Sequence, residues 1–396
     1  MLRVIILLLV LAPLAWWLDR EQRAGRFQRV DELFLDFLVA NSREKLTTPD
    51  PAARKDEVLL VRLDPADRAE YAGWPPLPID WQMILGGLRP AEDAVIVIPE
   101  PLQWGKPAPD FIPAVAEALV PLPSVVMGVE ARLAESAAGP AFTGGLENVI
   151  PGFQKAAGEP ELAPPISALM AAPDPAIRRH GELGLFTPNS MPYVLRDEEV
   201  LMPGVVAQAL ARLTRTPYAL HRVLLGPGAG AYLRQGVFVP LENDGRLAVD
   251  PQKPVNEINA LGFLSGGLAD ALGAEDKARI QAAKIIVLGV DDRNTPGIAR
   301  RHAQALAGVL SLPRIQLLGE FEQWIVWAVV ALAGLWMVAR TPRQKCPARG
   351  FLLIFATIVA VFLGFQTSLL WFPPTIPVAL LTASAMVGGI IGRRTA

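Results

Sequence analysis

The chain has 396 residues, of which 52% are hydrophobic and 19% are charged. This composition is too apolar for an ordinary soluble enzyme and too polar for an all-membrane transporter, so it predicts one part in lipid and a larger part outside it. Lys and Arg number 37 against 39 Asp and Glu, a formal charge of -2. No basic field is present to hold a nucleic-acid backbone, and we expect no nucleic-acid partner.

Cysteine and histidine are scarce. The single Cys346 excludes an internal disulfide framework and a Cys-based zinc site, and the three histidines lie too far apart in the sequence to predict a His cluster. We therefore expect no metal and no cofactor, and any metal chemistry would have to rest on carboxylates.

The first apolar run covers residues 4–18 and ends in the aromatic pair Trp16-Trp17, as a membrane anchor does at the lipid–water interface. A cleaved signal peptide is the alternative, but no small-x-small cleavage site follows, so residues 1–18 are predicted to stay as an anchor. Residues 324–339 form a second span. The uncharged stretch 350–392 is long enough for two more crossings of about 20 residues each, with a turn near 366–374 where Pro373 and Pro374 interrupt the helix.

Basic residues near the spans set the expected orientation. With both termini in the cytosol, the loop 340–349 and the tail 393–396 lie inside, and residues 19–320 lie in the periplasm or outside the cell. The basic residues placed inside are Arg3, Arg340, Arg343, Lys345, Arg349, Arg393 and Arg394. Those left outside are Arg20, Arg23, Arg26 and Arg29, with Arg314 as a fifth. The inner side is more basic, so a multi-pass protein of the plasma membrane is predicted.

The exported region opens on a predicted helix. Residues 27–41 place Val30, Leu33, Phe34, Phe37 and Leu38 at helical spacing, so we expect a helix with that face buried.

Beyond it, short aliphatic runs alternate with helical stretches, which predicts an α/β fold with a mixed or mostly parallel sheet. These segments are residues 58–63, 80–88, 94–98, 112–119, 124–129, 237–239, 247–249, 284–289 and 297–309. Residues 131–177 are rich in Ala, Pro and Gly and are expected to be a long loop or an insertion.

Two motif clusters suggest a family. The first runs from Leu59-Leu60-Val61-Arg62-Leu63-Asp64 through Gly73-Trp74-Pro75-Pro76 to a strand ending in Pro99-Glu100. The second is Val287-Leu288-Gly289, Asp291-Asp292, Thr295-Pro296-Gly297 and His302-Ala303. With one span before and three after the domain, the chain resembles the bacterial extracellular sensory domain called CHASE, type two, which is associated with cyclases and histidine kinases.

The chain departs from that family in the shortened Thr295-Pro296-Gly297 segment and in three other places. Glu100 stands where the family usually has Asp, and the family's Asp-Gly-x-x-Arg element has only Arg196-Asp197 as a counterpart. Members that signal alone also continue past the last span into a cytosolic catalytic domain, whereas residues 393–396 leave no room for one. The resemblance therefore implies a stand-alone sensor that works through a separate signalling protein.

Candidate ligand residues follow predicted strands or form an aromatic turn. In a parallel sheet, residues that follow the strands gather at one edge, where ligands bind. Each has a structural alternative as well: helix capping for the acids, packing for the tryptophan, and a core role for the histidine. The candidates are Asp64, Trp74, Glu100, Asp291, Asp292, Thr295 and His302.

Motifs for catalysis are missing from the sequence. The glycine-rich segment 226–230 lacks the spacing of a phosphate loop, and no nucleophile elbow occurs. The predicted spans carry no ionisable residue, which argues against a transporter.

We therefore expect a non-enzymatic membrane receptor that binds a small envelope ligand, with membrane lipid and a signalling protein as partners and a homodimer left open. The rivals are an envelope scaffold that binds another protein and a tethered periplasmic hydrolase.

Overall fold

The computed structural model describes most of the chain, with gaps between the described segments. The described residues are 2–50, 57–100, 102, 112–122, 124–133, 160–162, 174–179, 189–197, 200–218, 221–225, 228–233, 236–264, 272–292 and 297–391. They form two compact units: a helical unit of residues 1–46 and 314–396, and an α/β unit of residues 47–313. The division falls inside the predicted exported region, because its first helices pack with the C-terminal helices.

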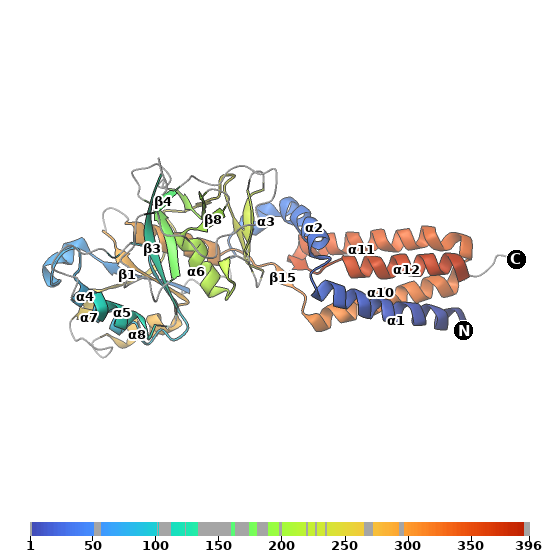
Figure 1. The fold of residues 1–396 in the computed structure, drawn as a ribbon, viewed down its shortest axis with the longest axis horizontal. Coiled ribbons are helices and arrows are strands. Elements are labelled where there is room, and N and C mark those ends of the chain that lie inside the picture. The colour runs from blue at the N-terminus through green and yellow to red at the C-terminus, as the bar shows by residue number, and fades with distance from the viewer. Residues whose placement is uncertain are drawn as a thin grey trace. The chain divides into compact units, whose positions relative to one another are not determined.

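A mostly parallel sheet is the centre of the α/β unit (Figure 1). Its strands are β1 (Val58–Leu63), β2 (Val95–Ile98), β3 (Ser124–Leu133), β4 (Pro160–Leu162), β5 (Asp174–Arg179), β13 (Asn256–Asn259) and β14 (Ile285–Val290). The order is β13-β1-β14-β2-β3-β4, with β5 also on β3, and only the β3–β4 pair is antiparallel. The α/β prediction is confirmed.

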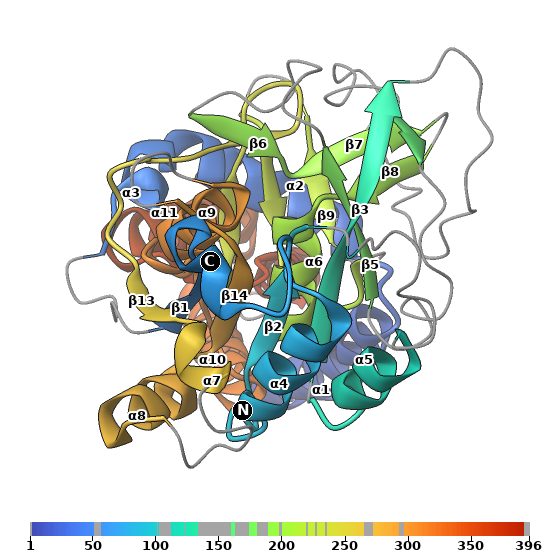
Figure 2. The same ribbon diagram turned by 90° about the vertical axis from the view of Figure 1, so that its left-hand side faces the viewer.

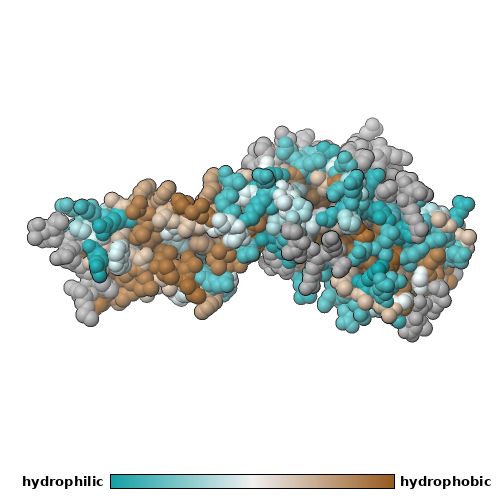
Figure 3. All heavy atoms as spheres, turned by 180° about the vertical axis from the view of Figure 1, so that it is seen from behind, coloured by the Kyte–Doolittle hydropathy of each residue, from teal (hydrophilic) through white to brown (hydrophobic). Residues whose placement is uncertain are grey.

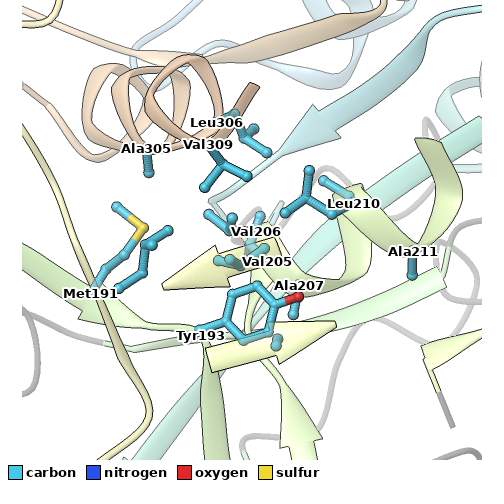
Figure 4. Close-up of a cluster of buried hydrophobic side chains, with 14 of the residues drawn as sticks. Met191, Tyr193, Val205, Val206, Ala207, Leu210, Ala211, Ala305, Leu306 and Val309 are labelled. Atoms are coloured by element: carbon cyan, nitrogen blue, oxygen red, sulfur yellow. The ribbon is translucent and has the colours of Figure 1, made fainter. Parts of the chain in front are cut away.

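The strands are aliphatic throughout because both faces of the sheet are covered. One face packs on α4 (Pro78–Gly87), α5 (Ile112–Leu119), α7 (Leu261–Leu264) and α8 (Ala274–Ala282). Helices α4 and α5 lie side by side (Figure 2). The other face packs on α6 (Val205–Leu213) and α9 (Ile298–Leu310), which bury the core drawn in Figure 4.

Short strands complete the layer around α6. They are β6 (Ser190–Pro192), β7 (Val194–Asp197), β8 (Val200–Pro203), β9 (Arg222–Leu224), β10 (Gly230–Tyr232), β11 (Phe238–Pro240) and β12 (Arg246–Ala248). The 3₁₀ helix η2 (Pro65–Glu70) follows β1 directly.

The expectation for residues 131–177 was wrong where this segment is described. Residues 131–133 continue β3, and β4 and β5 add to the central sheet. The pattern was missed because the strand β5 reads Asp-Pro-Ala-Ile-Arg-Arg, without the aliphatic run of the buried strands.

The helical unit contains α1 (Leu2–Arg23), α2 (Gln28–Asn41), α3 (Arg43–Thr47), α10 (Glu320–Arg340), α11 (Cys346–Ser368) and α12 (Thr375–Ile391). The two-residue strands β15 (Gln316–Leu317) and β16 (Leu370–Trp371) pair in parallel, and η7 (Arg343–Lys345) precedes α11. The segments 320–340 and 343–368 are long and apolar enough to cross a membrane, and α12 is a shorter apolar helix. Apolar side chains cover much of the surface of this unit (Figure 3).

Helix α2 forms as expected, but of the predicted buried face only Leu38 is buried. Asp31, Leu38 and Val39 are its buried residues. Val30, Leu33 and Phe37 are exposed. Helical spacing identifies an apolar stripe but does not say what covers it.

Candidate functional site

The carboxyl ends of β1 and β14 lie side by side at the centre of the sheet. Leu63 pairs with Val290 in the strand register, and the Asp291 backbone N–H donates to the Leu63 carbonyl at 3.0 Å. Asp64 and Asp291, the next residues of each chain segment, are therefore neighbours at this edge, and both are buried. Glu100, which closely follows the adjacent strand β2, is half-buried.

The Asp64 carboxylate already has hydrogen-bond and ion-pair partners within the chain. Its Oδ1 accepts a hydrogen bond from the Ala66 backbone N–H at 2.9 Å, which caps η2. Its Oδ2 lies 3.1 Å from Nη1 of Arg62 in an ion pair that is buried on both sides. Capping, the structural alternative for this residue, is present, so any ligand would meet a carboxylate that already has partners.

Asp291 is engaged in the same way. Its Oδ1 accepts from the Gly297 backbone N–H at 2.8 Å, and its Oδ2 accepts from Nε of Arg300 at 2.9 Å. Arg300 also pairs with Glu257 of β13. Desolvation opposes the charge of Arg300, but its hydrogen bonds with Asp291 and Glu257 outweigh it and raise the Arg300 pKa. This network joins β14, α9 and β13.

Gly297 is required at the start of α9. A Cβ there would lie 2.5 Å from the Val290 carbonyl oxygen and 3.1 Å from Cα of Asp291. The close approach brings the N–H of this N-cap residue onto the Asp291 carboxylate.

Arg62 was not singled out from the sequence as a candidate site residue. It is 3% exposed near the end of a strand whose other five residues are aliphatic. Among the described residues its Nε has no hydrogen-bond partner. A buried donor without a partner is costly, by about 1–3 kcal/mol. The detectable signal was one charged residue in a strand that reads as buried on both faces.

The aromatic turn lies between η2 and α4. The Tyr71 ring is 5.4 Å from the Trp74 ring. The Tyr71 hydroxyl is buried and has no hydrogen-bond partner among the described residues. Burial, then the negative charges of Asp67, Asp80 and Asp64, raise the pKa of Tyr71, so its hydroxyl stays protonated.

Asp80 fixes this turn and was also missed. Its carboxylate accepts hydrogen bonds from the backbone N–H groups of Ala72 at 3.1 Å and Leu77 at 3.0 Å. The turn consequently presents three exposed apolar side chains, which we call the 74–79 patch: Trp74, Leu77 and Ile79. In the described part of the α/β unit, Val120 is the other large apolar residue that is exposed.

The other predicted site residues are His302, Asp292 and Thr295. His302 is buried within α9, where its Nδ1 lies 2.8 Å from the Ile298 carbonyl oxygen. Asp292 is half-buried, and Thr295 lies outside the described residues. Within the described segments, no group of three or more His, Cys, Asp or Glu side chains is arranged to hold a metal ion.

A second set of buried polar side chains lies in the core against α6. The hydroxyls of Tyr193 and Tyr218 have no hydrogen-bond partner in the described part of the chain. His221, whose ring is 5.4 Å from that of Tyr218, is 2% exposed. Burial is the main effect on His221 and lowers its pKa to about 4, against a smaller opposing effect of the Thr216 backbone. His221 is therefore neutral near pH 7.

Comparison with known proteins identifies no relative. No protein-family model, no curated protein sequence and no solved structure matches the chain. The resemblance to the sensory family therefore stays a prediction based on its two motif clusters.

Proposed function

We propose that the chain is a membrane-anchored receptor. A small ligand binds the α/β unit at the carboxyl edge of the sheet, and the ligated population changes the packing of the helical unit, which a separate signalling protein reads. The resemblance to the CHASE type-two family supports this proposal. The single observation that carries it is the anchoring of both connections of the α/β unit to one turn, residues 366–375.

The incoming connection is the segment of α2 and α3, which leads from α1 into the α/β unit. Its helix α2 contacts the 366–375 turn. Oδ1 of Asp31 accepts hydrogen bonds from the Thr375 hydroxyl at 2.7 Å and from the Thr375 backbone N–H at 3.3 Å. A carboxylate at this position favours the start of α12, because it complements the helix dipole and an unpaired N–H. Burial raises the pKa of Asp31 in spite of the Thr375 hydrogen bonds. The ring of Phe34 lies 6.2 Å from that of Trp371 in the same turn.

The last part of the incoming connection holds the end of α11. The Lys45 ammonium donates to the carbonyl oxygens of Gln366, at 3.2 Å, and Thr367. A cation there complements the negative end of α11. One connection thus supplies an anion to the start of α12 and a cation to the end of α11.

The outgoing connection, residues 314–319, leads from the α/β unit to α10 and pairs with the same turn. The Gln316 backbone N–H donates to the Leu369 carbonyl at 2.9 Å, and that of Leu318 donates to the Trp371 carbonyl at 3.1 Å. A displacement of either connection would therefore also displace the 366–375 turn. A ligand that binds two arrangements of the α/β unit differently would shift the packing of α11 and α12.

The proposed membrane arrangement has four spans, α1, α10, α11 and α12, with the basic loop around η7 in the cytosol. Arg343 and Arg349 of this loop hydrogen-bond to the Gly389 carbonyl and the Thr341 hydroxyl. The α/β unit then lies on the other side, in the periplasm or outside the cell.

The 74–79 patch supports the proposed place of the ligand. Exposed apolar groups beside buried polar groups are typical of ligand and partner sites. Tyr71 and Arg62, each with a buried polar atom that lacks a hydrogen-bond partner in the described residues, also interact electrostatically with each other.

The test uses the whole chain in nanodiscs. A thermal-shift screen against small polar metabolites and ions identifies ligands, and hydrogen exchange then reports protection of the 366–375 turn. We expect hits that are lost in Trp74→Ala and Leu77→Ala and kept in Val120→Ala, an exposed apolar control from the same unit.

Ligand binding should change exchange in the turn, and Asp31→Asn should weaken that change. Binding with no effect on the turn contradicts the receptor. If no compound binds and the 74–79 patch instead binds a protein partner, the envelope-scaffold hypothesis replaces the receptor proposal.

A further inference from the structure

The apolar stripe of α2 lies on the surface of the helical unit. Val30 is 59% exposed, Leu33 63% and Phe37 53%. Their spacing of three and four residues puts them on one side of the helix. Another side of the helix carries Asp31, Leu38 and Val39, which are buried. Helix α2 therefore buries a carboxylate and exposes three large apolar residues. This orientation is expected where the surroundings of the helical unit are apolar.

The stripe is continuous with the apolar surface of α11. The ring of Phe37 lies 6.2 Å from that of Phe362. Leu363, the next residue of α11, is 53% exposed. This helix belongs to a segment long and apolar enough to cross a membrane. The medium that covers the exposed face of α11 beside Phe362 therefore also reaches Phe37.

One cation lies beside the start of the stripe, while Asp31, Glu32 and Asp36 make α2 acidic overall. Arg29 is exposed one residue before Val30, and it forms no ion pair with the described residues. Arg26, just before the helix, is exposed as well and pairs with Glu21 at 2.8 Å. Interfacial helices combine an apolar stripe in the acyl boundary with basic residues at the level of the headgroups.

We infer that α2 is an interfacial helix that inserts Val30, Leu33 and Phe37 into the outer boundary of the same bilayer that α11 crosses. The stripe thus binds lipid, with Arg29 at the headgroups. This inference rests on the membrane placement in the proposed function, and it adds a lipid contact to the helix that holds the start of α12. A change in the lipid around α2 would then move Asp31 and, through its hydrogen bonds, the 366–375 turn.

The experiment uses the full chain with its only cysteine removed, Cys346→Ala. Single cysteines are introduced by Leu33→Cys on the stripe, Leu363→Cys on α11 and Val120→Cys on the α/β unit, where Val120 is 73% exposed. Each is labelled with an environment-sensitive fluorophore and reconstituted in phosphatidylcholine–phosphatidylglycerol nanodiscs. Brominated lipids and aqueous iodide serve as quenchers. We expect brominated lipid to reduce emission roughly twofold at Leu33→Cys and Leu363→Cys, and iodide to quench Val120→Cys alone.

Each outcome separates the two proposals. Quenching at Leu363→Cys but not at Leu33→Cys, with Leu33→Cys open to iodide, overturns the interfacial helix and leaves the membrane placement intact. Loss of lipid quenching at both positions overturns both. A Leu33→Cys probe shielded from lipid and iodide, with disulfide-linked dimers when unlabelled, shows that a second copy covers the stripe, and this also overturns the lipid contact.

Discussion

The α/β unit and the helical unit distribute charge and apolar surface in opposite ways. The α/β unit buries the Arg62–Asp64 pair and Asp291, and exposes few large apolar side chains among its described residues. The helical unit exposes many, including Leu332, Phe351 and Phe355. Apolar groups gather where water is excluded, so the comparison indicates that the two units meet different solvents.

Packing inside the two units differs as well. The α/β core consists mainly of aliphatic side chains on both faces of the sheet. The helical unit brings backbones together at small residues: Cβ atoms built on Gly334 and Gly350 would lie 2.4 Å from Oγ of Ser384 and 2.3 Å from Cβ of Ala385. Close contact through small residues is the usual way in which helices associate in lipid, where burial of apolar surface gives no advantage.

The largest expected effect is the loss of the buried ion pair in the α/β unit. Asp64→Ala leaves the Arg62 guanidinium buried without a counter-ion, and we expect the free energy of unfolding to fall by about 3–5 kcal/mol. Urea unfolding of the chain in detergent, followed by a probe in the α/β unit, measures it.

The double variant Arg62→Met and Asp64→Ala is the matched control. It removes both charges and should recover most of the loss, because an apolar replacement of a buried pair is often neutral. A double variant as unstable as Asp64→Ala would show that the cap on Ala66, rather than the charge, is what matters.

A charge on the exposed surface distinguishes the two solvents. Leu332→Arg, near the middle of α10, should disfavour membrane insertion by about 2.5–3.5 kcal/mol. Val120→Arg in the α/β unit should change stability by no more than about 0.5 kcal/mol. The yield of membrane-inserted chain and its melting temperature test both. Equal tolerance at the two sites would contradict the comparison.

Because of this close packing, replacing glycine by alanine should change the stability of the helical unit in opposite directions at two positions. Gly334→Ala forces a Cβ against Ser384 and should destabilise the helical unit by about 1–3 kcal/mol. Gly364→Ala in α11 has no atom within 4 Å of the new Cβ, and should be neutral or stabilising by up to about 1 kcal/mol. Thermal melts in one detergent compare them, and similar melting temperatures would contradict close packing at Gly334.

Sequence patterns predicted the parts of the fold that are set by local chemistry. The aliphatic strands β1, β2 and β14 and the helices α5 and α9 lie within two residues of their expected positions. The edge position of Asp64 and Asp291 also followed, because parallel strands end together. The partners of these acids did not, since Arg300 and Gly297 meet Asp291 only once α9 packs on the sheet. For the same reason the spacing in α2 could not reveal that Asp31 reaches Thr375, 344 residues away.

Acid should weaken the α/β unit through His221, an effect that is absent at neutral pH. Its pKa is about 4 in the folded chain, against an ordinary histidine value of 6.5. Above pH 6.5 both states are neutral at this residue. Between pH 6.5 and 4 the unfolded chain binds a proton that the folded chain does not, so the free energy of unfolding falls by up to about 1.4 kcal/mol per pH unit. Measured against wild type, His221→Gln should remove this part of the slope while the carboxylates keep theirs. Identical slopes in wild type and variant would mean that His221 reaches water and takes up a proton in the folded state, which would weaken the contrast between the two units.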